Sequence, residues 1–126
     1  MNREERIELF KRDLAALVPE RDAMVIFNLA HDEDTFIQYS HVQAGDPLLC
    51  EVSNRSEGWN AHSLDARQVE ALRALGYEIP SPHHQANPRK ESAGDPAALA
   101  AETEQIFRNV FGVPEDYEVE SSGVLW

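Results

Sequence analysis

Residues that could carry out chemistry are few and isolated in this chain. Cys50 is its single cysteine, and a thiol beside a histidine can act as a nucleophile. However, Cys50 stands inside an apolar run, where thiols are normally buried and inert. Glu51 and Glu78 could form an acid–base pair, but exposed carboxylates are common on strands. The glycines are isolated and form no phosphate-binding loop. We therefore expect no catalytic residue, and an enzyme ranks third among the functions considered.

Two stretches contain residue types that metals prefer. Residues 31–34 read His-Asp-Glu-Asp, but the central glycine and final glutamate of an EF-hand loop are absent from this sequence. His83 and His84 are adjacent, so their side chains rarely point at one ion, and the sequence places no cysteine or third ligand beside them. A polar turn and a proline-rich loop explain both stretches, and we expect no metal and no cofactor.

Charge and hydropathy narrow the classes of partner. The 126 residues carry a formal net charge of −12, which repels nucleic acid and disfavours anionic membranes. The sequence contains no apolar run near the ~20 residues of a membrane span. Its charged, amphipathic N-terminus lacks the apolar segment of a signal peptide. We expect one domain over residues 1–126, with residues 121–126 as a candidate flexible tail, in a cytoplasmic protein.

Three apolar runs, at residues 23–29, 35–42 and 48–53, form the centre of the predicted fold. They are rich in the β-branched and aromatic residues typical of strands. The breaks between them are too short for a crossover helix, so we expect an antiparallel meander. The face expected to be buried carries Val25, Phe27, Leu29, Ile37, Tyr39, Leu48, Cys50 and Val52.

Amphipathic helices are predicted on both sides of the meander along the chain. The first starts at a capping box of Asn2 and Glu5 and places its charged residues, Asp13 among them, largely away from the apolar stripe. The second covers residues 65–76 and the third residues 95–112, each from an Asp N-cap to a Gly C-cap.

Short strands complete the predicted α+β fold. Residues 77–79 form one, residues 84–87 form either a loop or a second, and residues 117–119 form a candidate edge strand. The expected order is α-β-β-β-α-β(β)-α, with helices packed on the meander.

Several segments, taken in order, resemble a known family. Leu-Leu-Cys-Glu-Val-Ser-Asn at 48–54 is followed by Leu-Asp-Ala-Arg-Gln at 64–68 and Leu-Arg-Ala-Leu-Gly-Tyr at 72–77, and then by Pro80 and Asn87. This order is similar to that of small bacterial domains grouped with type III secretion chaperones and YbjN proteins, the TY-Chap family. The chain departs from the family pattern at Tyr77, where a tryptophan is expected, and at Pro88, where an aromatic residue is expected.

The resemblance covers nearly the whole chain, since residues 35–39 and 95–111 also look like the family's second strand and last helix. It implies a secretion-chaperone-like α+β fold. It also implies a chaperone-like role with a protein or extended peptide as client. The departure at Pro88 concerns the expected fourth strand and any groove near it.

The second face of the meander is the candidate binding surface. Its large apolar side chains are Met24, Ile26, Phe36 and Leu49. In water they would form an exposed apolar patch, which is typical of an interaction surface; alternatively, a helix of the same chain covers them. Trp59 and Trp126 are a second candidate pair of contact residues.

The favoured function is therefore a non-enzymatic protein- or peptide-binding module of the chaperone type. The alternative is a small regulatory or structural subunit that acts through a fixed protein–protein interface, and a homodimer is open in either case. Nucleic acid and membrane are not expected as partners.

Overall fold

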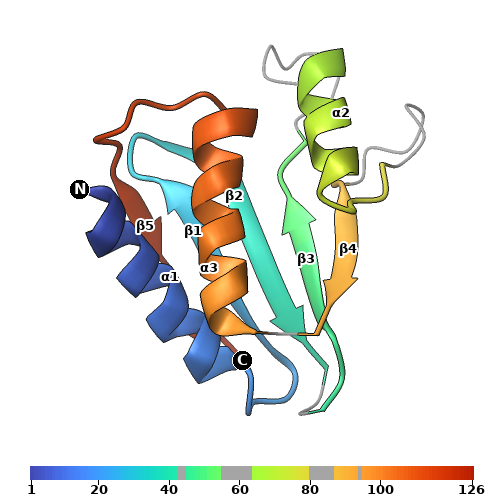
Figure 1. Cartoon of the computed structure of the whole chain (residues 1–126). Helices are drawn as coiled ribbons and strands as arrows, with labels where there is room; N and C mark the ends of the chain where they lie inside the picture. Colours follow the sequence, from blue (N-terminus) through green and yellow to red (C-terminus); the bar gives the residue numbers. More distant parts are fainter. Residues whose placement is uncertain (43–44, 55–63, 80–86, 94) are drawn as a thin grey trace.

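The computed structural model describes residues 1–42, 45–54, 64–79, 87–93 and 95–126. The elements are α1 (Arg3–Leu17), β1 (Ala23–Leu29), β2 (Asp32–His41), β3 (Leu48–Val52), α2 (Ala66–Ala74), β4 (Arg89–Ser92), α3 (Pro96–Gln105), the π-helical turn η1 (Ile106–Val110) and β5 (Val119–Ser121). The strands form one sheet in the order β4-β3-β2-β1-β5, and the helices lie on one of its faces (Figure 1). The predicted α+β class is confirmed.

The meander is the centre of the sheet, as predicted. β1 pairs antiparallel with β2, and β2 with β3. Buried and half-buried residues alternate along β1 and β3, and along β2 from Thr35 onward. Every residue assigned to the inner face of the meander is buried, because side chains on a strand point alternately to opposite faces.

The outer strands differ from their predicted positions. Residues 84–86 lie outside the described residues, and the fourth strand is β4, whose polar sequence Arg-Lys-Glu-Ser carries no apolar alternation. Pro88 does not prevent this strand, because its carbonyl accepts a hydrogen bond from the Val52 N–H at 3.0 Å. Residues 77–79 contribute only a bridge between Glu78 and Arg89. β5 begins at Val119 rather than at Tyr117, whose side chain is buried in the core.

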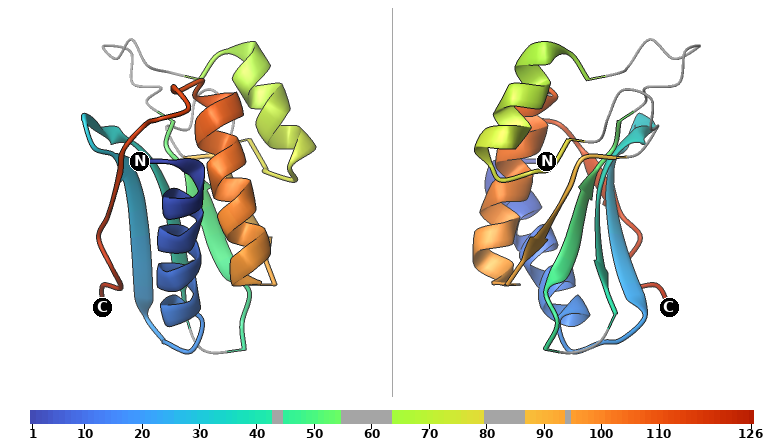
Figure 2. Two further views of the ribbon diagram at one scale, coloured as in Figure 1. Left: turned by 60° about the vertical axis from the view of Figure 1, so that its left-hand side comes forward. Right: turned by 90° about the vertical axis from the view of Figure 1, so that its right-hand side faces the viewer.

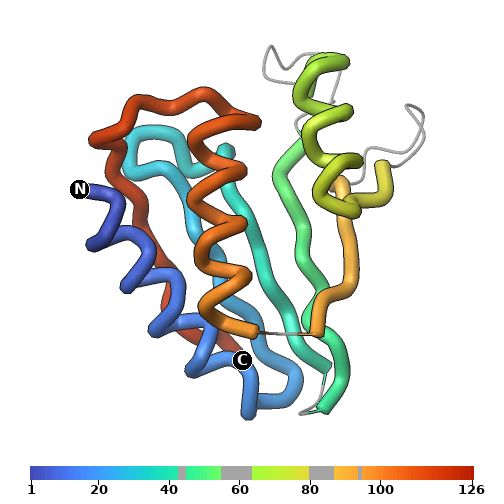
Figure 3. Tube along the Cα trace, viewed as in Figure 1, coloured from blue at the N-terminus to red at the C-terminus, as the bar shows by residue number. Residues whose placement is uncertain are grey.

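The C-terminal residues continue along the outer side of β1. The Ser122 N–H donates to the Ile26 carbonyl at 3.0 Å, and the Leu125 N–H donates to the Met24 carbonyl at 2.8 Å. The tube in Figure 3 shows this segment passing behind α1. Residues 121–126, the candidate flexible tail, thus extend the pairing of β5 with β1.

The helices begin and end where the sequence predicts. Asn2 and Glu5 form the capping box of α1, and Asp65 and Gln68 that of α2. Gly76 follows α2 with a φ of +94°, in the left-handed region. The last helix changes character near its end: the Phe111 N–H donates to the Ile106 carbonyl at 3.1 Å, which is an i→i+5 hydrogen bond.

Aromatic contacts join the helices to the inner sheet face. The Phe10 ring of α1 lies 4.8 Å from the Phe27 ring and 6.1 Å from the Phe107 ring, measured between centroids. The Tyr39 hydroxyl lies 2.6 Å from the Thr103 hydroxyl of α3. α2 joins the same layer through Gln68, whose side-chain amide donates to the Val110 carbonyl at 2.8 Å.

A buried ion pair connects α1 to α3. The Arg6 guanidinium donates to both carboxylate oxygens of Glu104, at 2.9 and 2.6 Å, and the Tyr117 hydroxyl donates to the same carboxylate at 2.8 Å. Burial alone would raise the pKa of Glu104, but the hydrogen bonds from Arg6 and Tyr117 outweigh it and hold the pKa below its usual value. Asp13, predicted on the polar side of α1, is also buried, because it accepts a hydrogen bond from the Ser121 hydroxyl at 2.5 Å.

We predict that Gly76→Ala lowers the free energy of unfolding by about 1 kcal/mol, because alanine disfavours positive φ. An added Cβ would meet only Lys90 Cδ at 3.8 Å, so the loss is conformational rather than steric. Gly76→Asn is the matched variant and should lose less, since asparagine tolerates this conformation. Urea unfolding measures both. An alanine variant as stable as the parent would contradict the left-handed cap.

We also predict that Arg6→Met lowers the free energy of unfolding by about 3–5 kcal/mol, because it leaves the Glu104 carboxylate buried without its partner. The double variant Arg6→Met, Glu104→Met should lose less than the single variant. Arg73→Met is the control, since that side chain forms an exposed ion pair with Glu70 within α2, and should cost at most about 1 kcal/mol. Equal losses for Arg6→Met and Arg73→Met would disprove the role of the buried pair.

Candidate functional site

The structure separates the residues considered for catalysis. Cys50 is fully buried on the inner face of β3, and burial raises the pKa of its thiol to about 12. It is therefore protonated and unreactive at neutral pH. Arg89 of β4 pairs with Glu51 of β3 on one side and with Glu78 on the other. β4 therefore lies between the two glutamates. The Glu51 carboxylate accepts a hydrogen bond from the Gln38 amide at 3.2 Å.

The stretches considered for metal binding do not form a ligand set in the described parts of the chain. Asp32 accepts hydrogen bonds from the Asp34 N–H at 3.2 Å and from the Thr35 hydroxyl at 2.7 Å, which is the pattern of a polar turn. Across the residues that the structure describes, no group of three or more His, Cys, Asp or Glu side chains could hold a metal ion. His83, His84 and Trp59 lie outside the described residues.

Met24, Ile26, Phe36 and Leu49 all lie on the sheet face that is turned away from the helices, which we call the open face. Each is half-buried. Figure 2 shows α1, α2 and α3 together on the opposite face, where α1 packs on β1 and β2. No helix of the described chain therefore covers the open face.

The strand register arranges these side chains in a stripe. Met24 and Ile26 are successive outward residues of β1, and Phe36 is paired with the next one, Asn28. Leu49 lies across the small Ser40 from Met24. A stripe of large apolar side chains thus follows β1 and passes to β2, beside the hydrogen-bonded Gln38 and Glu51.

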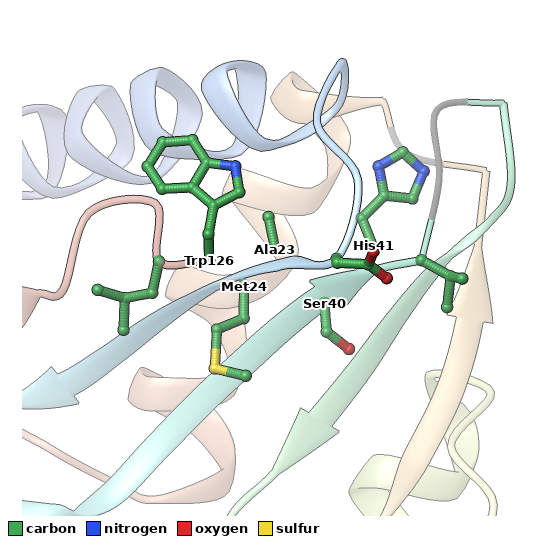
Figure 4. A pocket seen from close by; sticks show the side chains of 8 residues that line it. Ala23, Met24, Ser40, His41 and Trp126 are labelled. Carbon is green, nitrogen blue, oxygen red and sulfur yellow. The ribbon is translucent and has the colours of Figure 1, made fainter.

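A pocket of about 400 Å³ lies at the Met24 end of this stripe. Among the described residues, the large apolar side chains classed as exposed all line it: Val42 at 69%, Leu125 at 43% and Trp126 at 78%. Figure 4 shows Met24 and Ser40 pointing to one side of the β1–β2 ribbon and Trp126 and His41 to the other. The pocket therefore lies at the end of the sheet, where the C-terminal residues run beside β1.

Sequence reasoning did not identify Val42 and Leu125 as members of this surface. Val42 comes directly after β2, and Leu125 reaches the surface through its backbone pairing with Met24. The outward period of β2 could have indicated Val42, two residues after Ser40. The sequence holds no local signal for Leu125.

Cys50 provides a test of the closed inner face. We predict that a thiol-reactive dye labels it slowly in the native protein and rapidly in denaturant, since a buried thiol with a raised pKa has little thiolate and no access. The matched control is Cys50→Ala, Val42→Cys, which places the only thiol at an exposed position and should label quickly in the native state. Fast native labelling of Cys50 would contradict the burial and make the thiol a candidate nucleophile again.

One known protein family matches nearly the whole chain. The sequence profile of the TY-Chap3 family, described as T3SS (YopN, CesT) and YbjN peptide-binding chaperone 3, matches residues 8–124. No curated protein and no solved structure matches the chain significantly. Within the described residues, no helix has the length and apolar character needed to cross a membrane. The family match spans almost all of the fold, including every strand and the buried core, and the chain therefore belongs to the TY-Chap3 family of peptide-binding chaperones.

Proposed function

We propose that this domain is a non-enzymatic, chaperone-like module that binds a protein or peptide client on the open face of its sheet. The observation that carries the proposal is the position of Met24, Ile26, Phe36 and Leu49 on a face that no described helix covers. Val42 and Leu125, which are exposed at the pocket, continue this surface. The family match supports a peptide as client.

Energetics favour a role in binding for these side chains. The domain already has a closed core on the inner face, where Phe10, Phe27 and Phe107 are fully buried. Half-buried side chains on the open face add less to folding than core residues do. A partner that covered them would gain roughly 25 cal/mol for each Å² of apolar surface removed from water.

The same face would serve the alternative function, a regulatory or structural subunit with one fixed partner. The two differ in selectivity: a chaperone-like module binds several apolar peptides with moderate affinity, whereas a fixed interface accepts one partner surface. Binding of unrelated peptides selected from a random displayed library would favour the chaperone-like module.

We predict that Phe36→Ser and Leu49→Ser each lower the free energy of unfolding by about 1 kcal/mol, because both side chains are half-buried. Affinity for a library-selected peptide should fall by about tenfold or more, since a few apolar anchors carry most interfaces. Thermal melts and fluorescence anisotropy measure the two effects.

Two controls accompany these variants. Ile37→Ser changes the fully buried neighbour of Phe36 and should cost about 2–5 kcal/mol. Ile7→Ser changes a half-buried side chain of α1 and should leave peptide affinity unchanged. Severe destabilisation by both open-face variants, or unchanged affinity in both, would refute binding at this face.

A further inference from the structure

The open face also indicates the shape and charge of its client. Building on the proposed function, we infer that the open face binds an amphipathic α-helix whose apolar side is flanked by lysine or arginine. Three features lead to this client: the hydrogen bonding of the sheet backbone, the length of the apolar stripe, and the charges beside it.

The backbone of the central strands is already paired. β2 forms ladders with β1 and β3, and the second side of β3 pairs with β4. The second side of β1 pairs with β5 and with Leu125. An extended peptide laid across this face would find no free backbone partner in the described central strands, and its own N–H and C=O groups would lose water without compensation. A helix satisfies its backbone internally and can lie on the face of a sheet.

The sheet edges are a poor alternative for an extended client. β5 has three residues and continues along β1 only through the bonds of Ser122 and Leu125, and β4 has four residues. On the outer side of β4, the Arg89 N–H and C=O already pair with Glu78 at 3.1 and 2.7 Å. Strand addition needs a run of free backbone groups, and the stripe of Met24, Ile26, Phe36 and Leu49 does not lie at these edges.

The stripe has the length of a short helix. Successive outward residues on a strand are about 7 Å apart, so the path from Met24 through Ile26 to the level of Phe36 spans about 14 Å. A helix rises about 1.5 Å per residue, so nine or ten residues would cover that path with apolar anchors at i, i+3 or i+4, and i+7. The pocket at the Met24 end would take one end of this apolar side.

Acidic side chains lie on both sides of the stripe. Glu120 of β5 is paired with Asn28 on one side, and Glu91 of β4 is paired with Leu49 on the other. Glu51 adds a third carboxylate, and Arg89 is the basic residue opposite it in register. Basic residues flanking the apolar side of a helix would complement these carboxylates. A second copy of this chain would instead oppose like charges, on a molecule whose formal net charge is −12.

The experiment compares three labelled peptides of equal length against the full 126-residue chain. The first places leucines and lysines at helical spacing, the second has the same composition with strict alternation, and the third has the helical spacing with glutamate in place of lysine. Fluorescence anisotropy should show the first peptide binding about tenfold or more tightly than the others, with affinity falling as salt rises. Circular dichroism should show a gain of helix when the first peptide binds.

Charge-reversed variants locate the effect on the open face. Glu91→Lys with Glu120→Lys should weaken binding of the first peptide about fivefold or more at physiological salt. The control is Glu8→Lys with Glu115→Lys, which makes the same change in net charge at exposed positions on the helix side and should alter affinity less than about twofold, because salt screens distant charges. Ile26→Ser keeps the charge and should abolish most of the binding.

The possible results distinguish the client from the binding face. The alternating or the acidic peptide could bind as tightly as the first peptide, with Ile26→Ser weakening that binding. This result would overturn the basic helix as client while the proposed binding face stands. Peptide binding that Ile26→Ser does not change would overturn both the basic helix and the proposed binding face. Both would also be overturned if none of the three peptides binds and no library-selected peptide binds at this face. A dimer that Ile26→Ser dissociates, measured by light scattering, would make a second copy the occupant and overturn the basic helix.

Discussion

The buried ion pair between Arg6 and Glu104 is the interaction on which the helix layer depends. It joins α1 to α3 across 98 residues of sequence, and the Tyr117 hydroxyl adds the segment that leads into β5. A charge without water is tolerated only with good partners. The bidentate geometry therefore fixes how the two helices lie against each other, and the layer they form covers the inner face of the sheet.

The sheet has one covered face and one open face because the helix layer packs on one side of it. Both α1 and α3 pack on the inner face, and α2 joins them through hydrogen bonds to the carbonyl end of η1. Since the described helices are all used there, the alternation of the strands leaves apolar side chains on the other face. The proposed client-binding surface is the face that this division of the sheet leaves uncovered, and the core stays closed on the other face.

The acidic composition has a physical role in this arrangement. A protein with an uncovered apolar face tends to associate with itself. Under the proposed function, a formal net charge of −12, with Glu91 and Glu120 beside the stripe, would oppose contact between two copies through that face and favour partners of opposite charge.

The sequence by itself determined the elements whose causes are local. The capping boxes at Asn2 and Asp65 join residues three apart, Gly76 needs only its own backbone angle, and the strand alternation separated the buried face from the candidate surface. The tertiary structure decided what depends on distant partners. β4 is polar and exists through its pairing with β3, Asp13 is buried because β5 reaches it, and Leu125 joins the open face because its backbone pairs with Met24. Periodicity and capping act within a few residues, whereas these contacts link segments up to 108 residues apart, for which the local sequence carries no signal.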